Sequence, residues 1–155
     1  MSRKTNQYTY QETLFSNNST LIQRAIREGD GVSVILKSLV VAYPTQDQLQ
    51  RFSFSYEVSK KFDHPNVIKV LDYQEQNNSP FIVIEDQQSI DLRRYTQQQP
   101  DKRLSLGDFL TIAIQIAEAL SVIHHAHVIH KDLHPGNLLI NPQTLKVQVS
   151  DFGLA

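Results

Sequence analysis

The longest regular segment of the sequence, residues 104–127, separates two unlike parts of the chain. Apolar residues recur in it at the three- and four-residue spacing of an amphipathic helix, and Ser105 with Asp108 forms an S-x-x-D capping box at its start. We therefore predict a buried core helix, whose apolar face consists of Phe109, Ile112, Ala113, Ile116, Ala117, Leu120 and Ile123. The segments on either side of this helix decide the fold class.

The part before the helix begins with predicted strands separated by turns. Residues 20–27 and 32–40 have strand-like patterns, and in the second of them apolar and polar residues largely alternate. Gly29 and Gly31 lie between them and allow positive φ, which favours a tight hairpin.

A helix and two further strands are predicted next. Residues 45–62 have an imperfect apolar face, Thr45 can cap the helix, and the following DHPN sequence ends it. Strands are expected at residues 67–74 and 81–86, joined by the turn-rich residues 75–80.

The part after residue 86 contains little besides the long helix. The Gln-rich residues 96–103 are predicted to form an exposed loop, and Leu145, Val147 and Val149 alternate with polar residues as in a short strand. The sequence therefore predicts an α+β protein, whose second part has too few helices to close its own core.

Composition excludes several classes of function. The 155 residues carry a net charge of −1, which gives no electrostatic reason to expect nucleic acid or anionic membrane as a partner. The chain has no cysteine, so disulfides, thiolate zinc sites and thiol catalysis are excluded. The first twenty residues are polar, and no apolar run approaches membrane-spanning length, so we expect a soluble cytoplasmic protein.

Five histidines lie close together in the sequence: His124, His125, His127, His130 and His134. They match no H-E-x-x-H or Cys/His spacing, so we do not predict a zinc site.

Three short motifs occur in an order that points to phosphoryl transfer. His130–Asn137 reads HKDLHPGN, residues 151–153 read DFG, and Lys37 lies on a predicted strand far upstream. Phosphoryl transfer needs metal ions on the phosphates, a cation for the α- and β-phosphates, and a group that orients the attacking hydroxyl. Each motif alone is weak, but the three together match H-R-D-L-x-x-x-N, D-F-G and the strand lysine.

With these motifs the chain resembles a eukaryotic-like serine/threonine protein kinase over residues 8–155, from the N-terminal lobe into the C-terminal lobe. It is most similar to kinase domains that open large bacterial signalling proteins, ahead of an AAA-type ATPase module and a sensor histidine kinase. The resemblance implies a flexible arm at residues 1–7, an N-lobe at 8–86 and the start of a C-lobe at 87–155. It also implies that the rest of the domain follows Ala155.

The resemblance also implies ATP and Mg²⁺ as cosubstrates, a protein serine or threonine as acceptor, and a role in signal transduction. It implies a catalytic set of Asp132, Lys37, His134 and Lys131, with Asp132 as the base, and it makes Asn137 and Asp151 the metal ligands. Nucleotide binding would fall to Lys37, Ile22, Ile35, Ile84, Glu85, Gln87 and Leu139, with Ile84 as gatekeeper and Glu85–Gln87 as the hinge against adenine.

The sequence departs from the family pattern in several places. The expected glycine-rich loop contains no glycine around residues 14–25. The position that normally carries the helix glutamate is Ser55, and Glu57 would point about 200° away from it. His134 replaces a lysine, and Lys131 replaces an arginine that is a better bidentate partner for phosphate.

Three readings of the function remain open on these residues. The first is a protein kinase domain, and we expect this chain by itself to have little or no kinase activity. The second is a pseudokinase-like regulatory module that binds nucleotide without turnover. The third is a small-molecule kinase of the aminoglycoside-phosphotransferase type, since those enzymes also carry H-x-D-L-H-P-G-N.

Overall fold

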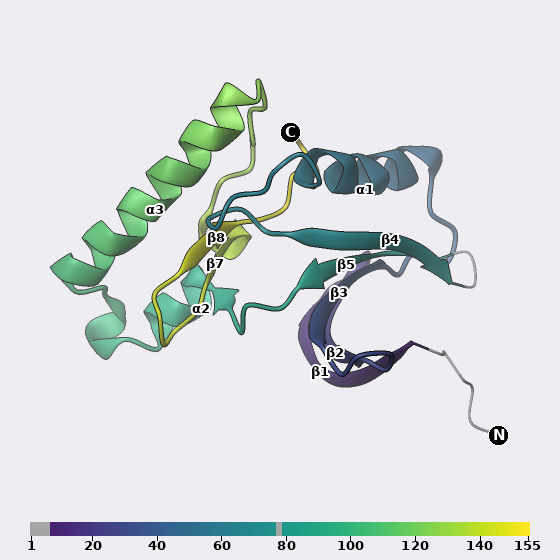
Figure 1. Ribbon diagram of the computed structural model, residues 1–155, viewed down its shortest axis with the longest axis horizontal. Helices are drawn as coiled ribbons and strands as arrows, with labels where there is room; N and C mark the ends of the chain where they lie inside the picture. Colours follow the sequence, from purple (N-terminus) through teal and green to yellow (C-terminus); the bar gives the residue numbers. More distant parts are fainter. Residues whose placement is uncertain (1–6, 77–78) are drawn as a thin grey trace. The chain divides into compact units, whose positions relative to one another are not determined.

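The computed structural model describes residues 7–76 and 79–155, and these form two compact units (Figure 1). The first unit comprises Met1–Leu49 and Val70–Asp86, and the second comprises Gln50–Lys69 and Gln87–Ala155. All but the last residue of the predicted arm, and the middle of the predicted turn at residues 75–80, lie outside the described residues. Each unit is considered separately below.

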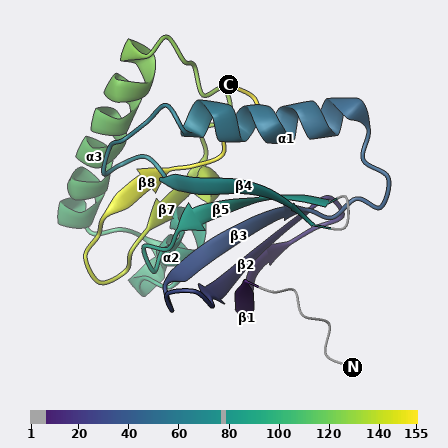
Figure 2. The same ribbon diagram turned by 45° about the vertical axis from the view of Figure 1, so that its right-hand side comes forward.

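The first unit is an antiparallel sheet whose strands, within the described residues, lie in the order β1-β2-β3-β5-β4 (Figure 2). The strands are β1 (Tyr8–Ser16), β2 (Thr20–Arg27), β3 (Ser33–Leu39), β4 (Val70–Gln76) and β5 (Ser79–Glu85). The predicted hairpin is confirmed by the pairing of β2 with β3. Gly31 has the expected positive φ of 70°, whereas positive φ is not found at Gly29.

One face of this sheet carries its apolar core. Ala25, Val34, Leu36 and Val83 are buried together, and Tyr8 packs with them edge-on against Phe81. Because side chains alternate along a strand, the residues between these core positions belong to the opposite face.

Helix α1 (Gln46–Ser59) begins where the sequence predicts and ends three residues earlier. The Gln48 N–H donates to Thr45 Oγ1 at 3.3 Å, and the Thr45 N–H donates to Gln48 Oε1 at 2.9 Å, so the helix starts with a reciprocal capping box. The last predicted residues form a turn in which the Phe62 N–H donates to the Ser59 carbonyl.

The second unit contains a short helix that the sequence analysis missed. Helix α2 (Leu92–Gln97) overlaps the predicted loop at residues 96–103, and a 3₁₀ turn (Pro100–Lys102) follows it. Asp91 caps α2 by accepting a hydrogen bond from the Arg94 N–H at 2.9 Å. The prediction of a loop over residues 96–103 was therefore wrong where α2 and the 3₁₀ turn overlap this range.

Helix α3 (Leu106–His125) confirms the long helix and its Ser105 cap, which accepts from the Asp108 N–H at 3.1 Å. Its predicted burial was only partly right. Ile112 and Ile123 are buried, but Phe109 is 53% exposed.

The exposed apolar side chains of α3 bear on the sequence prediction that no segment is long and apolar enough to span a membrane. Leu106, Leu110 and Ile114 are exposed, and by length and composition alone this 20-residue helix could cross a membrane. The sequence statement that no apolar run approaches that length was therefore too strong. One such helix is weak evidence, because a core helix of a soluble protein passes the same test.

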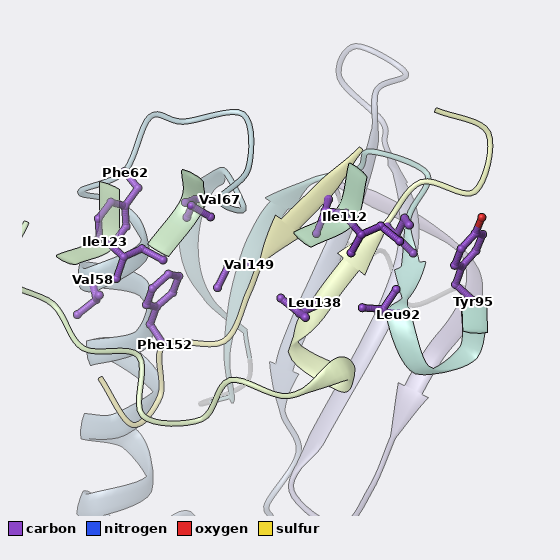
Figure 3. Close-up of a cluster of buried hydrophobic side chains, with 13 residues drawn as sticks. Val58, Phe62, Val67, Leu92, Tyr95, Ile112, Ile123, Leu138, Val149 and Phe152 are labelled. Atoms are coloured by element: carbon purple, nitrogen blue, oxygen red, sulfur yellow. The ribbon is translucent and has the colours of Figure 1, made fainter. Parts of the chain in front are cut away.

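The remaining elements of the second unit surround its core. Strands β6 (Ile90–Asp91), β7 (Leu138–Ile140) and β8 (Val147–Val149) form a small antiparallel sheet within the described residues. Figure 3 shows the side chains of this core, with Val149 and Leu138 from the sheet and Ile112 and Ile123 from α3.

A partly buried pair of amide side chains links α3 to β8. Asn66 Nδ2 donates to Gln115 Oε1 at 2.9 Å and to the Val147 carbonyl at 2.8 Å, while the Val147 N–H donates to Gln115 Oε1 at 2.9 Å. These bonds hold the strand that leads into Asp151.

Candidate active site

Four of the predicted nucleotide-binding residues lie on one face of the first unit's sheet. Ile22 is the cross-strand partner of Lys37, and Ile35 is the partner of Ile84. Directly paired residues project to the same face, and Ile35 and Lys37 are two residues apart on β3, so all four share the face opposite the apolar core. The four side chains are partly buried.

The loop that would replace the glycine-rich loop is closed by an asparagine. Asn17 Oδ1 accepts from the Ser19 N–H at 2.9 Å and from the Thr20 N–H at 2.7 Å. An Asx turn of this kind orders the β1–β2 connection without glycine. It also occupies two of the backbone donors that a phosphate-binding loop would offer.

The predicted hinge residues follow directly from β5. Glu85 is the last residue of that strand and pairs with Val34. In the second unit the Gln87 carbonyl accepts from Asn141 Nδ2 at 2.9 Å. Leu139, the predicted adenine floor, is partly buried at the centre of β7.

The loop of the second unit that carries the HKDLHPGN motif joins Asp132 and Asn137 through hydrogen bonds. Asn137 Nδ2 donates to the Asp132 carbonyl at 2.9 Å and to Asp132 Oδ2 at 3.1 Å. The Asn137 carbonyl in turn accepts from the N–H and the hydroxyl of Ser150. Since Ser150 directly precedes Asp151, these bonds connect Asp132 and Asn137 to the residue next to Asp151.

His130 supports this loop from inside. It is 2% exposed, and its Nδ1 accepts from the Asp132 N–H at 3.3 Å. The ring proton therefore resides on Nε2, which donates to the Ser150 carbonyl at 2.8 Å. Phe152 packs against His130, with ring centroids 5.0 Å apart. It also stacks on Phe62, with ring centroids 5.4 Å apart (Figure 3), and these contacts fix the residue after Asp151.

His134 faces the Asp132 carboxylate. The Gly136 N–H donates to His134 Nδ1 at 3.0 Å, so a neutral ring carries its proton on Nε2. That atom lies 3.8 Å from Asp132 Oδ2, and both side chains are about two-fifths exposed. The replacement of the family's lysine thus places a hydrogen-bond donor next to the predicted base.

Two residues of the motifs have unusual backbone conformations. Lys131 and Asp151 have φ angles of 62° and 64°, which are uncommon for residues other than glycine. Lys131 is exposed, and the Gly153 N–H donates to Asp151 Oδ1 at 3.3 Å. Such strain is often found at functional sites.

Helix α1 presents Ser55 and Glu57 differently. Ser55 is buried, whereas Glu57 is exposed, as expected for residues about 200° apart around a helix. The Ser59 hydroxyl donates to the Ser55 carbonyl at 2.7 Å.

Metal ligation can be judged only from the residues themselves. Among the described residues, no three His, Cys, Asp or Glu side chains gather as a metal-binding group. The amide nitrogen of Asn137 is used by Asp132, so its amide oxygen is the atom that can face a cation. An amide oxygen and the Asp151 carboxylate are the hard ligands that Mg²⁺ takes when phosphates and water complete its shell.

Sequence reasoning placed Asp86 within the predicted hinge but missed the side chains that hold it, Arg24 and Ser33. Asp86 accepts hydrogen bonds from Arg24 on β2 and from the Ser33 hydroxyl on β3. The available signal was a charged residue at the end of an otherwise apolar strand, but its partners lie more than fifty positions away.

Comparison with known proteins identifies the family. A family model described as protein tyrosine and serine/threonine kinase matches residues 10–155. Aurora/IPL1-related protein kinase 2 of Caenorhabditis elegans is 32% identical over 122 residues, which cover 79% of this chain and 38% of that protein.

Two further relatives have similar names. Serine/threonine-protein kinase ULK1 of Homo sapiens is 32% identical over 107 residues, covering 64% of this chain and 10% of that protein. Probable serine/threonine-protein kinase kinX of Dictyostelium discoideum is 36% identical over 115 residues, covering 72% of this chain and 10% of that protein. The chain therefore spans well under half the length of these relatives.

The chain belongs to the protein kinase family. The resemblance seen in the sequence is confirmed, and so is the α+β fold class, with an antiparallel sheet and few helices in the described residues. All three relatives are named as protein kinases and two of them as serine/threonine-protein kinases, which favours this branch over small-molecule kinases.

Proposed function

We propose that this chain is the catalytic part of a protein kinase that transfers the γ-phosphate of ATP to serine or threonine hydroxyls of proteins. The observation that carries the proposal is the hydrogen-bonded link from Asp132 through Asn137 to Ser150, next to Asp151. It is the kind of preorganised polar loop that phosphoryl transfer requires, because the reaction depends on positioning and charge.

Each unit supplies its own share of this reaction. In the first unit, Lys37 holds the α- and β-phosphates, Ile22, Ile35 and Ile84 contact the adenine, and Glu85 begins the hinge. In the second unit, Gln87 and Leu139 are the residues proposed for contacts with the base.

Asp132 orients the acceptor hydroxyl and takes up its proton as the reaction proceeds. His134, whose Nε2 lies 3.8 Å from Asp132 Oδ2, holds this carboxylate or donates to the transferred phosphoryl group. Lys131 supplies positive charge beside the same loop.

Asn137 and Asp151 would hold Mg²⁺, which neutralises the charge on the phosphates. The use of the Asn137 amide nitrogen by Asp132 supports this role, since it leaves the oxygen for the cation. The chain departs from the family pattern at Lys131, His134 and Ser55, but both proposed metal ligands, Asn137 and Asp151, are present.

The proposal also covers the setting of the reaction. The partners are ATP, a protein substrate and further chain or domains of the same protein, and the net charge of −1 gives no electrostatic reason to add nucleic acid or anionic membrane. The sequence has no cysteine, which is compatible with the reducing cytoplasm that we propose as its location.

The second candidate is a regulatory module that binds nucleotide without turnover. The Asn17 turn favours it, because the N–H groups of Ser19 and Thr20 are already bonded. Mg²⁺–ATP binding and phosphate transfer to a serine/threonine peptide mixture, both measured with the full-length protein, separate the candidates. Transfer that is lost in Asp132→Asn supports the kinase, whereas binding without transfer supports the regulatory module.

The small-molecule alternative is tested in the same assay. Added alcohols or aminoglycosides that consume ATP, when proteins do not, would overturn the proposal of a protein substrate.

A further inference from the structure

A polar cluster closes one end of the sheet face that we propose for nucleotide binding. It consists of Arg24 on β2, Ser33 on β3 and Asp86 directly after β5, all in the first unit. Arg24 Nε donates to Asp86 Oδ2 at 2.8 Å, Arg24 Nη2 lies 3.4 Å from Asp86 Oδ1, and the Ser33 hydroxyl donates to Asp86 Oδ2 at 2.7 Å.

The strand register places this cluster beside the predicted adenine contacts. Arg24 is the cross-strand partner of Ile35, and Ile35 is the partner of Ile84. Asp86 follows Ile84 by two residues, and the hydrogen bonds from Arg24 and Ser33 place its carboxylate on the same face. The cluster therefore borders the apolar residues that we propose to hold the base.

The cluster is unusual in its burial. The Asp86 side chain is 1% exposed and the Arg24 side chain is 13% exposed, although both groups are charged. Arg24 also forms an ion pair with Glu12 on β1, so one guanidinium connects β1, β2 and the residue after β5. A buried ion pair is weak evidence for stability, because desolvation offsets most of the attraction, but it favours one arrangement of the groups that it joins.

We propose that Asp86 is a positioning residue for adenine binding. Its carboxylate, held by Arg24 and Ser33, fixes the end of β5 and with it the Glu85 backbone and the Ile84 side chain. Asp86 acts through these neighbours and does not touch the nucleotide itself. This inference rests on the proposed nucleotide binding. It names residues that set the affinity of the protein for the adenine base.

The test uses the full-length protein and two ligands that share phosphates but differ in the base. Asp86→Asn keeps the side-chain size, removes the charge and weakens the hold of Arg24 on the strand end. We expect the Kd for Mg²⁺–ADP to rise about tenfold, while the Kd for Mg²⁺–tripolyphosphate stays within about twofold of the wild type. Isothermal titration calorimetry measures both constants.

The same hairpin provides a matched control. Arg27 donates to Asp30 at 2.5 Å, and this pair has the same chemistry as Arg24 with Asp86 but is exposed. Asp30→Asn should leave both dissociation constants unchanged.

A milder variant guards against misfolding of Asp86→Asn. Ser33→Ala removes one hydrogen bond and leaves the buried ion pair, so we expect the Kd for Mg²⁺–ADP to rise about threefold, with tripolyphosphate binding unaffected.

Each remaining outcome has a definite meaning. Equal weakening of both ligands by Asp86→Asn and Ser33→Ala would assign the cluster to general stability and overturn the inference. Unchanged ADP binding in both variants would also overturn it, while the proposed kinase would stand. A wild-type protein that binds no adenine nucleotide would overturn the proposed function, and this inference with it.

Discussion

The two units of this chain organise their candidate functional residues by different means. In the first unit, strand register gathers Ile22, Ile35, Lys37 and Ile84 on one sheet face, although they are distant in sequence. In the second unit, most of the candidate residues lie within about twenty positions and are held by side chain–backbone hydrogen bonds in a loop.

This difference has a consequence for mutation. A sheet face is fixed by many backbone hydrogen bonds. Because side chains alternate between the two faces of a strand, a substitution there changes either the apolar core or the proposed binding face, depending on which face the side chain belongs to. The loop depends on a few bonds made by single side chains, so one substitution can displace several groups.

The largest effect is expected in the loop, at Asp132. Asp132→Asn removes the proposed base and should lower phosphate transfer by at least about 100-fold, while nucleotide affinity changes little. Steady-state transfer to a serine/threonine peptide mixture and calorimetric ADP binding measure the two quantities.

The control for this change is Asp101→Asn, an exposed aspartate with a positive φ that asparagine tolerates. Loss of transfer in Asp101→Asn as well, or its retention in Asp132→Asn, would contradict the assigned role.

The next effect tests the two faces of β3. Lys37→Met should weaken Mg²⁺–ATP binding by about tenfold or more, because a charge-assisted contact to the phosphates is lost. The neighbouring Leu36 is buried on the opposite face, and Leu36→Ala should cost about 2–5 kcal/mol of unfolding free energy.

Chemical denaturation and calorimetry separate these two results. If Lys37→Met destabilised the fold as strongly as Leu36→Ala without weakening ATP binding, the assignment of the binding face would be wrong.

A smaller effect is expected at Gly136, where the loop has little space. A Cβ at this position would lie 2.8 Å from His134 Cε1 and 3.0 Å from Nδ1, so Gly136→Ala must displace the imidazole from its place beside Asp132. We expect about a tenfold loss of transfer, which is less than the roughly 100- to 10,000-fold typical of removing a general acid or base, because the imidazole is displaced and not lost.

A double-mutant cycle makes this prediction specific. In a His134→Ala background the alanine at position 136 has no ring to displace, so its additional effect should vanish. Equal losses in both backgrounds would indicate a backbone effect that does not involve His134.

The same contrast between a sheet face and a local loop explains which parts of the candidate site the sequence predicts. Asp132, Asn137 and Asp151 could be assigned from motifs, because the loop is local and its spacing sets its hydrogen bonds. The link between Arg24 and Asp86 could not be assigned, since it spans 62 positions and depends on the register of three strands.

The helices show two other limits of the sequence. The periodic pattern of apolar residues identified α3. Such a pattern shows only that one face of a helix is apolar and not that other residues cover this face, and Phe109 is in fact exposed. Helix α2 has six residues, too few for a periodic pattern, although Asp91 offered a capping signal.

The smallest effect concerns the exposed pair of Arg27 and Asp30 in the β2–β3 hairpin. The hydrogen bond from Arg27 holds the pKa of the Asp30 carboxyl below its ordinary value. A carboxyl with a lowered pKa in the folded state stabilises that state at neutral pH, and the contribution disappears as the pH falls through the lowered value. Because both groups face solvent, Asp30→Asn should lower Tm only slightly at pH 7, and 1 M NaCl should reduce the difference. Thermal melts of both proteins should converge at acid pH, and a difference that grew on acidification would show that the destabilisation by Asp30→Asn has another cause.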